Sequence, residues 1–167
     1  MREHDPQRPA ALDTSFWAAT TLAEAPGYVL RLFEVHCPSA VQEEITNERP
    51  PELRPDAALF RELVRHGAVR ITDPRIVTVS VFGRGERATL SLAAERNWIA
   101  LVNEWRAAAY GRTALRLTVM DVPQLILTVC AAGHVQKVKA HQMLGRIASI
   151  TAPAVMHEAA RVLSELP

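Results

Sequence analysis

The chain has 167 residues, of which 49% are hydrophobic and 22% charged, and its 19 basic side chains nearly balance 18 acidic ones. This length allows one well-buried core but not two typical domains, and the composition excludes an intrinsically disordered chain. The net charge of +1 excludes general binding to polyanions, so a nucleic-acid site would have to be a local patch. We expect a single domain over residues 1–167, with a flexible segment at residues 1–9.

Short apolar runs alternate along the chain with longer apolar stretches at helical spacing. The first strand is expected at residues 10–12, and Asp13, Thr14 and Ser15 then provide capping side chains for a helix that runs through Leu22.

A turn is expected at Pro26-Gly27, a second strand at residues 35–37, and a helix from Pro38 onward. Three prolines among charged residues predict an exposed loop over residues 47–55.

A helical stripe over residues 59–64 ends near Gly67, and a third strand is expected at residues 68–71. Two interpretations stay open for residues 72–84, because their apolar part, residues 76–81, suits either a strand or an extended loop.

From Gly85 the pattern predicts a helix, then a buried strand at residues 98–102, a helix at 104–110 and a last strand at 115–119. The remainder is expected to form helices, with apolar stripes at Leu125, Ile126 and Val129, at Val138, Met143 and Leu144, and at Val155, Ala159, Val162, Leu163 and Leu166.

This alternation predicts an α/β fold, a three-layer α/β/α sandwich around a central parallel sheet. Side chains at the carboxyl ends of parallel strands face the crevice in which ligands bind. Asp13 follows the first expected strand, and Asn103 and Glu104 follow the strand at residues 98–102. We therefore expect these side chains at one crevice.

Two further acids, Glu44 and Glu86, lie in the first turns of expected helices and can reach the same crevice. Glu43 competes with Glu44, which we favour because it keeps a helical offset from Val41. Clustered carboxylates repel one another unless a divalent cation neutralises them, and oxygen ligands suit Mg²⁺ or Mn²⁺. Such a metal activates water and stabilises the charge on a phosphoryl group, so the cluster predicts phosphodiester hydrolysis.

Four motifs carry a resemblance to a known family. They are Leu12-Asp13-Thr14-Ser15, Pro38 to Ile45, Gly83-Arg84-Gly85-Glu86, and Ile99 to Glu104. In this order and at these separations they resemble the PIN domains, and in particular the VapC-like ribonuclease branch with a Gly-x-Gly-Glu motif. The resemblance extends from about Ala10 to the turn at residues 132–135.

The resemblance implies that Asp13, Glu44 and Glu86 bind Mg²⁺ or Mn²⁺, with support from the hydroxyls of Thr14 or Ser15. It also implies that the substrate is single-stranded RNA and that the protein acts as a toxin restrained by an antitoxin. The metal ligands and catalytic residues would include Asn103, with Glu104 beside it. Basic side chains near this crevice would bind the RNA phosphates; they are Arg84, Arg87 and Arg106.

The chain departs from the family pattern at Asn103, where the family usually has Asp. An Asn carbonyl can ligate a hard cation, but it brings no charge and cannot act as a base. Glu104 or Asp121 could compensate. An arginine expected slightly later is replaced by alanine at position 107 or 108, with Arg106 nearby.

Three functions remain open at this stage. The first is a metal-dependent endoribonuclease, the toxin of a prokaryotic toxin–antitoxin pair. The second is a degenerate PIN domain that binds RNA or a protein partner without cleavage. The third is a phosphatase-like α/β hydrolase, which is disfavoured because no covalent nucleophile motif accompanies the acids.

The remaining features indicate a cytoplasmic protein without a membrane span or a secretory leader, and we expect a homodimer. Cys37 and Cys130 are expected to be free thiols, and the histidines to be surface or boundary residues. Trp105 is expected to be a packing anchor, with base stacking as the alternative.

Overall fold

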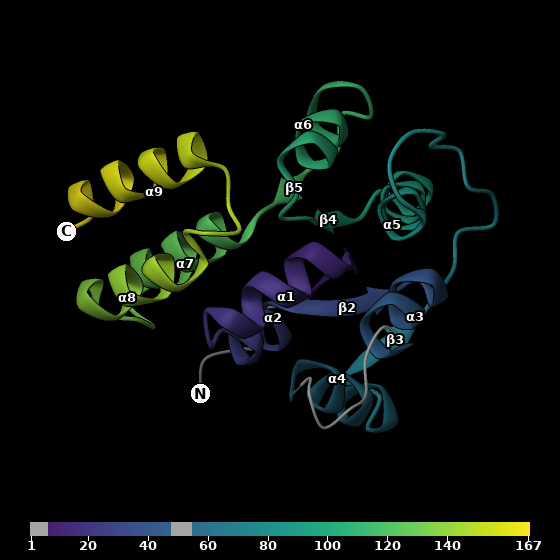
Figure 1. Ribbon diagram of the computed structural model, residues 1–167, viewed down its shortest axis with the longest axis horizontal. Helices are drawn as coiled ribbons and strands as arrows, with labels where there is room; N and C mark the ends of the chain where they lie inside the picture. The colour runs from purple at the N-terminus through teal and green to yellow at the C-terminus, as the bar shows by residue number, and fades with distance from the viewer. Residues whose placement is uncertain (1–6, 48–54) are drawn as a thin grey trace.

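The computed structural model describes residues 7–47 and 55–167. Within these ranges five parallel strands form one sheet in the order β3-β2-β1-β4-β5, which confirms the expected α/β fold (Figure 1). The strands are β1 (Arg8–Leu12), β2 (Phe33–Cys37), β3 (Val69–Ile71), β4 (Ile99–Leu101) and β5 (Val119–Met120).

Helices cover both faces of the sheet. Alternate residues of the central strand enter two different cores, Ala10 and Leu12 on one face and Ala11 on the other. Burial on both faces explains why β1 is apolar throughout. The first core receives α1 (Thr14–Leu22), α2 (Pro26–Leu32), α3 (Ser39–Asn47), α4 (Pro55–Arg65), α7 (Val122–Ala131), α8 (Lys137–Ile147) and α9 (Pro153–Glu165), and the second receives α5 (Arg84–Arg96) and α6 (Trp105–Thr113).

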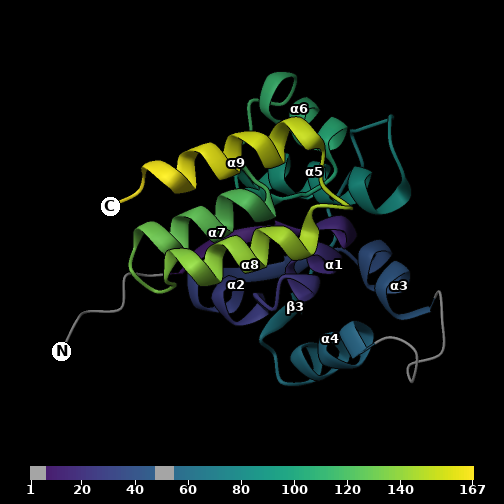
Figure 2. The same cartoon turned by 60° about the vertical axis from the view of Figure 1, so that its left-hand side comes forward.

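The three C-terminal helices pack against one another and form one group (Figure 2). The apolar stripes expected here are largely buried, and Leu125, Ile126 and Met143 are among the most buried large side chains. Val138 is an exception, because 69% of it is exposed.

Strand β1 begins at Arg8, two residues before the expected start. Pro9 is accommodated because it pairs with Glu34 on β2, while the pairing of β1 with β4 starts only at Ala10. At Pro9 the strand has a neighbour on one side only, where a residue without an N–H group is tolerated. Of the segment expected to be flexible, residues 1–6 lie outside the described part.

Two expectations about the secondary structure were wrong. Pro26 and Gly27 begin helix α2 instead of a turn, since the fixed φ of proline suits the first helical position. The last strand is β5, not residues 115–119, because the chain is still turning there. Arg116 has a φ of 55°, and Leu117 N donates to Gly111 O at 2.9 Å.

The open question about residues 72–84 is answered by an extended loop, which joins β3 to α5. The amides of Thr78 and Val79 donate to Ser91 Oγ on α5, at 3.0 and 3.2 Å, and not to a neighbouring strand. The other expected loop, residues 47–55, lies outside the described residues except for its ends, which belong to α3 and α4.

His36 is buried in the sheet, contrary to the expectation of a surface or boundary position. Its Nδ1 lies 2.9 Å from Thr72 Oγ1, and its ring centroid lies 4.3 Å from that of Trp98. These partners compensate the burial of a polar ring, and desolvation lowers the pKa of His36. Both cysteines are free thiols. No helix among the described residues is long and apolar enough to cross a membrane.

Candidate active site

The sheet order creates a crevice at the carboxyl ends of β1 and β4. Strands β2 and β3 follow β1 on one side of it, and β4 and β5 follow on the other side, so the strand order reverses between β1 and β4. Ligands bind in parallel sheets at such a reversal of strand order. Asp13 directly follows β1, and its backbone N–H donates to Leu101 O at 3.0 Å. Residues 13 and 103 therefore lie at the same edge of the sheet.

Asp13 caps helix α1 through one of its two carboxylate oxygens. Oδ2 accepts hydrogen bonds from Ser15 N at 2.9 Å and from Ser15 Oγ at 2.5 Å. The side chain is almost fully buried, and Oδ1 is a buried atom without a hydrogen-bond partner among the described residues. Capping thus uses Oδ2, and the buried Oδ1 has no hydrogen bond in the described part of the chain.

The Asp13 carboxyl is coupled to two other acids. Its pKa is raised from 3.8 to about 6, because burial and the charges of Glu86 and Glu44 together outweigh the hydrogen bonds from Ser15, which lower it. Desolvation and like charges both disfavour the ionised form. The carboxylates of Asp13, Glu44 and Glu86 therefore share one electrostatic environment.

Glu44 joins three helices. Its Oε2 accepts from Thr14 Oγ1 at 2.6 Å on α1, and its Oε1 accepts from Gly85 N at 2.8 Å on α5. Glu43 instead forms an exposed ion pair with Arg84, with 2.7 Å between Oε2 and the guanidinium. Glu44, and not Glu43, therefore faces the other acids.

Glu86 lies in the first turn of α5, where its Oε2 accepts a hydrogen bond from Gly83 N at 2.7 Å. An acid in this position is stabilised by the free amides at the start of a helix. The bond folds the Glu86 side chain back toward Gly83, the residue that precedes the helix.

Asn103 is placed differently from the acids. Its Oδ1 accepts from Val122 N at 3.2 Å, and its Nδ2 lies 3.4 Å from Thr151 Oγ1. The amide thus joins the start of α7 to the segment before α9. Its connection to Asp13 runs through Ser15, whose Oγ accepts the backbone N–H of Asn103 and that of Glu104, both at 3.1 Å.

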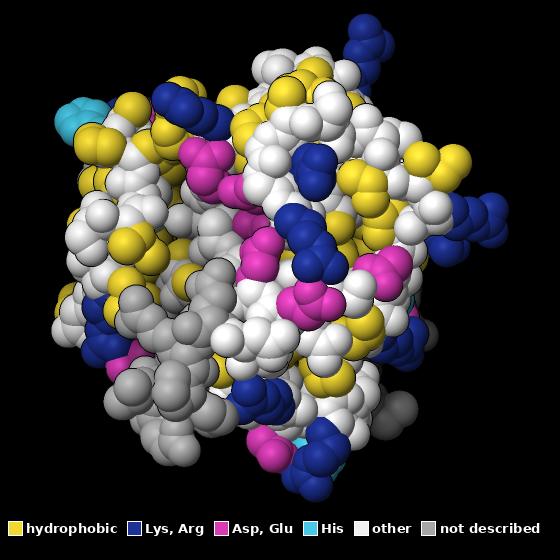
Figure 3. Space-filling model, turned by 45° about the vertical axis from the view of Figure 1, so that its right-hand side comes forward, with side chains coloured by type: hydrophobic (Ala, Val, Ile, Leu, Met, Phe, Trp, Pro, Cys, Tyr) yellow, Lys and Arg dark blue, Asp and Glu magenta, His cyan; other side chains and the backbone are white. Residues whose placement is uncertain are grey.

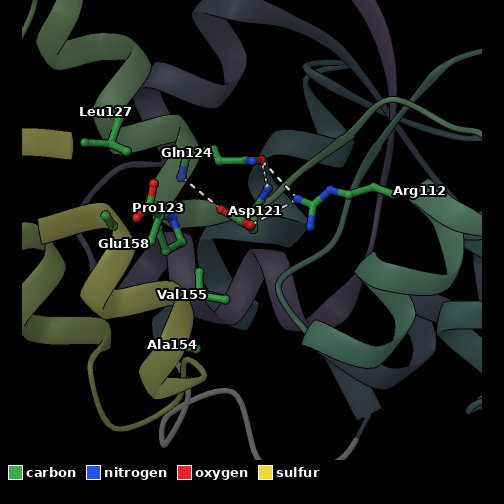
Figure 4. A pocket seen from close by; sticks show the side chains of 9 residues that line it. Arg112, Asp121, Pro123, Gln124, Leu127, Ala154, Val155 and Glu158 are labelled. Carbon is green, nitrogen blue, oxygen red and sulfur yellow. Dashed lines mark hydrogen bonds and ion pairs between the residues drawn. The ribbon is translucent and has the colours of Figure 1, made fainter. Parts of the chain in front are cut away.

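The side chains of Glu104 and Asp121 are also engaged elsewhere. Glu104 caps α6 and accepts from Ala107 N at 2.8 Å. Asp121 caps α7 and pairs with Arg112 at 3.1 Å, where it lines a pocket of about 320 Å³ between α7 and α9 (Figure 4). No local sequence pattern indicates this pocket, because its lining comes from three separate helices.

The acidic cluster offers the ligand atoms that a hard cation prefers, but its side chains are not already arranged around one ion. Carboxylate oxygens are the donors that Mg²⁺ and Mn²⁺ prefer, and Asp13 Oδ1 is buried and uncommitted. In residues 7–47 and 55–167, however, no three Asp, Glu, His or Cys side chains are positioned to hold a metal ion together. Glu44 and Glu86 are turned toward the first turn of α5.

The basic and aromatic residues expected here differ in their surroundings. Arg106 stacks on the ring of Trp105, with 5.4 Å between its Cζ and the ring centroid, and Trp105 is 54% exposed instead of packed. Arg87 has no side-chain partner in the described part of the chain, and its Nε is buried. Figure 3 shows a band of acidic side chains with basic side chains next to it.

Comparison with protein-family models finds no match for this chain, and a search of curated proteins finds none either.

Proposed function

We propose that the protein is a metal-dependent endoribonuclease that hydrolyses phosphodiester bonds of single-stranded RNA. The observation that supports this most strongly is the buried Asp13 carboxylate, which has an uncommitted oxygen and shares its environment with Glu44 and Glu86 at the reversal of strand order. The resemblance of the four motifs to PIN domains supports RNA as the substrate class.

Asp13, Glu44 and Glu86 would hold Mg²⁺ or Mn²⁺, and the ion would supply an activated water and neutralise charge on the phosphoryl group. The chain's own hydroxyls orient these acids. Ser15 fixes Asp13, and Thr14 fixes Glu44. Burial and like charges raise the pKa of Asp13 to about 6 without metal, so a bound cation would displace this proton and keep the carboxylate ionised.

The decisive experiment is a cleavage assay with two substrates. End-labelled single-stranded RNA and a phosphomonoester are each incubated with the protein, with Mn²⁺ or with a chelator. We expect RNA cleavage only with Mn²⁺ and its loss in Asp13→Asn. A matched control is Glu62→Gln, which removes an exposed acid paired with Arg65 on α4 and should remain active. Hydrolysis of the phosphomonoester alone would instead favour a phosphatase.

The second candidate is a degenerate PIN domain that binds RNA or a protein without cleavage. Two observations favour it, namely the engaged amide of Asn103 and the absence, in the described residues, of a preformed three-ligand set. RNA binding without cleavage, at any Mn²⁺ concentration, would support this alternative and contradict the first.

We further propose a cytoplasmic toxin that forms a homodimer and is restrained by an antitoxin protein. Expression of the chain should then arrest growth, and co-expression with the product of an adjacent gene should relieve the arrest. Growth arrest should also disappear in Asp13→Asn. The mass in solution, measured by light scattering, tests the dimer.

A further inference from the structure

A cavity of about 510 Å³ lies beside the acidic cluster, between the first turns of α3 and α5 and the loop of residues 72–83. Ser39 on α3, Arg84 and Arg87 on α5, and Val77 in the loop are among the residues that line it. Asp13, Glu44 and Glu86 are not among its lining residues, but the lining residue Arg84 is followed by Gly85, which donates to Glu44.

Three charged side chains line this cavity, and only one of them, Arg87, has no side-chain partner among the described residues. Arg84 pairs with Glu43 at 2.7 Å. Asp73 accepts hydrogen bonds from Ser39 N at 2.8 Å and from Ser39 Oγ at 2.9 Å, so its carboxylate binds the first residue of α3. Arg87 alone has no hydrogen bond or ion pair through its side chain within the described ranges, although its Nε is buried.

A partly buried guanidinium without a partner indicates an anionic ligand. Desolvating a charge without compensation is costly, and the planar guanidinium matches the oxygens of a phosphate group. Ser39 and Ser80 add hydroxyl groups to the lining, while Pro74, Val77 and Val79 add apolar surface. The volume is in the range of sites that enclose a small organic ligand such as a nucleotide.

We propose that this cavity binds one nucleotide of the RNA strand next to the cleaved phosphodiester, with its phosphate group on Arg87. The inference rests on the proposed function for the identity of the strand. In this assignment the phosphate contacts the polar side chains of the cavity, and the sugar and base contact the apolar wall around Val77.

Binding is measured separately from cleavage. A fluorescent ten-nucleotide RNA is titrated with the protein in a chelator, and anisotropy gives Kd at several salt concentrations. We expect Arg87→Gln to raise Kd about tenfold, as for the loss of one charge-assisted contact. The slope of log K against log salt should fall by about 0.7 because one phosphate contact is lost. Arg31→Gln is the matched control, since Arg31 is exposed at the end of α2, directly before the amino end of β2.

A second variant tests the same cavity in case Arg87→Gln does not fold. Val77 is 51% exposed, so Val77→Asp adds a negative charge to the cavity wall without emptying the core. It should also raise Kd, with an unchanged melting temperature. If both variants bind like the wild type while the wild type cleaves RNA, the cavity assignment is overturned and the proposed function stands. If binding depends on Arg87 but RNA is never cleaved, the proposed function falls, and only the assignment of the cavity to one nucleotide of a bound strand stands.

Two competitors identify the ligand further. A nucleoside 5′-monophosphate should compete only at much higher concentration than the unlabelled RNA, because the strand makes contacts beyond one nucleotide. Equal competition would overturn the assignment to a strand in favour of a free nucleotide. Binding of a glutamate-rich peptide, together with no binding of RNA by the wild type, would overturn it in favour of an acidic protein partner.

Discussion

Gly85 donates its backbone N–H to Glu44 Oε1 at 2.8 Å and leaves no room for a side chain, since a Cβ at residue 85 would lie 2.5 Å from Glu44 Oε2. A Cβ at Gly83 would likewise lie 2.6 Å from Glu86 Oε2. Neither glycine has a positive φ. A Cβ at either glycine of the Gly-Arg-Gly-Glu run would therefore displace a glutamate carboxylate, and neither glycine serves an unusual backbone conformation.

Gly85→Ala should displace the Glu44 carboxylate and weaken Mn²⁺ binding, while the helix itself tolerates alanine. Gly145 on α8 is a matched control, because nothing lies within 4 Å of a Cβ there. Gly145→Ala should raise the free energy of unfolding by up to about 1 kcal/mol through helix propensity alone. Calorimetric Mn²⁺ titrations and urea unfolding check both variants. Unchanged Mn²⁺ affinity in Gly85→Ala would mean that Glu44 is not a ligand.

Glu86→Gln should abolish Mn²⁺ binding with little loss of stability. Glutamine can still accept the Gly83 N–H, and the change removes a charge that raises the pKa of Asp13. Glu43→Gln removes a nearby but outward-facing charge and should leave Mn²⁺ affinity intact. Equal effects of the two variants in calorimetry would contradict a specific function for Glu86.

Stability without metal should fall as the pH rises from 3.8 to about 6. In this window the folded state keeps the Asp13 proton that the unfolded chain has released, so deprotonation favours unfolding. The loss is at most about 3 kcal/mol, since one pKa unit corresponds to roughly 1.4 kcal/mol. Urea unfolding in a chelator across this range measures it. The slope should flatten in Asp13→Asn, and a wild-type slope that persists there would assign the effect to other groups.

Asn103→Asp should raise Mn²⁺ affinity, because a negative oxygen is added next to the acidic cluster. Thr151 can then donate its hydroxyl to the new carboxylate, which replaces the present contact. RNA cleavage should rise as well if metal occupancy limits the wild type. Glu104→Gln tests whether Glu104 acts in place of the missing acid, since glutamine can still accept from Ala107 N and cap α6. If neither variant changes Mn²⁺ affinity or RNA cleavage, the alternative of RNA or protein binding without cleavage is favoured.

Trp105→Ala should weaken RNA binding by about 1–3 kcal/mol if a base stacks on the ring. The side chain is 54% exposed and follows Glu104, whose backbone N–H is bonded to Ser15, so it lies near the candidate site. Anisotropy measures the effect, and thermal unfolding should be nearly unchanged. A large fall in melting temperature with unaltered RNA affinity would indicate the packing function expected from the sequence.

Local patterns were sufficient to predict a parallel sheet, although they misplaced its last strand. The alternation of strands and helices follows from hydrophobic periodicity within short windows, and it placed Asp13 and Asn103 after two strands. That Glu44 faces inward could be anticipated from its helical offset to Val41. The catalytic interpretation of these residues remains a prediction.

Long-range hydrogen bonds could not be predicted in the same way. The Asn103 amide bonds to Thr151, which lies 48 residues further along the chain, and Gly85 bonds to Glu44 across 41 residues. No local pattern encodes such pairings, because they depend on how packed elements orient their side chains. The same holds for Arg87, whose lack of a partner appears only once α3, α5 and the loop are assembled.

The hydroxyl of Ser15 has consequences for how the protein is made. It accepts amides that lie 88 and 89 residues downstream, so its network closes only when β4 has joined β1. Contacts of such sequence separation form late in folding. While the ribosome is still producing the first half of the chain, Asp13 therefore lacks the neighbours from β4 that contact it in the folded protein. The nascent polypeptide would then gain its buried acid, and any nuclease activity with it, only after β4 has been synthesised.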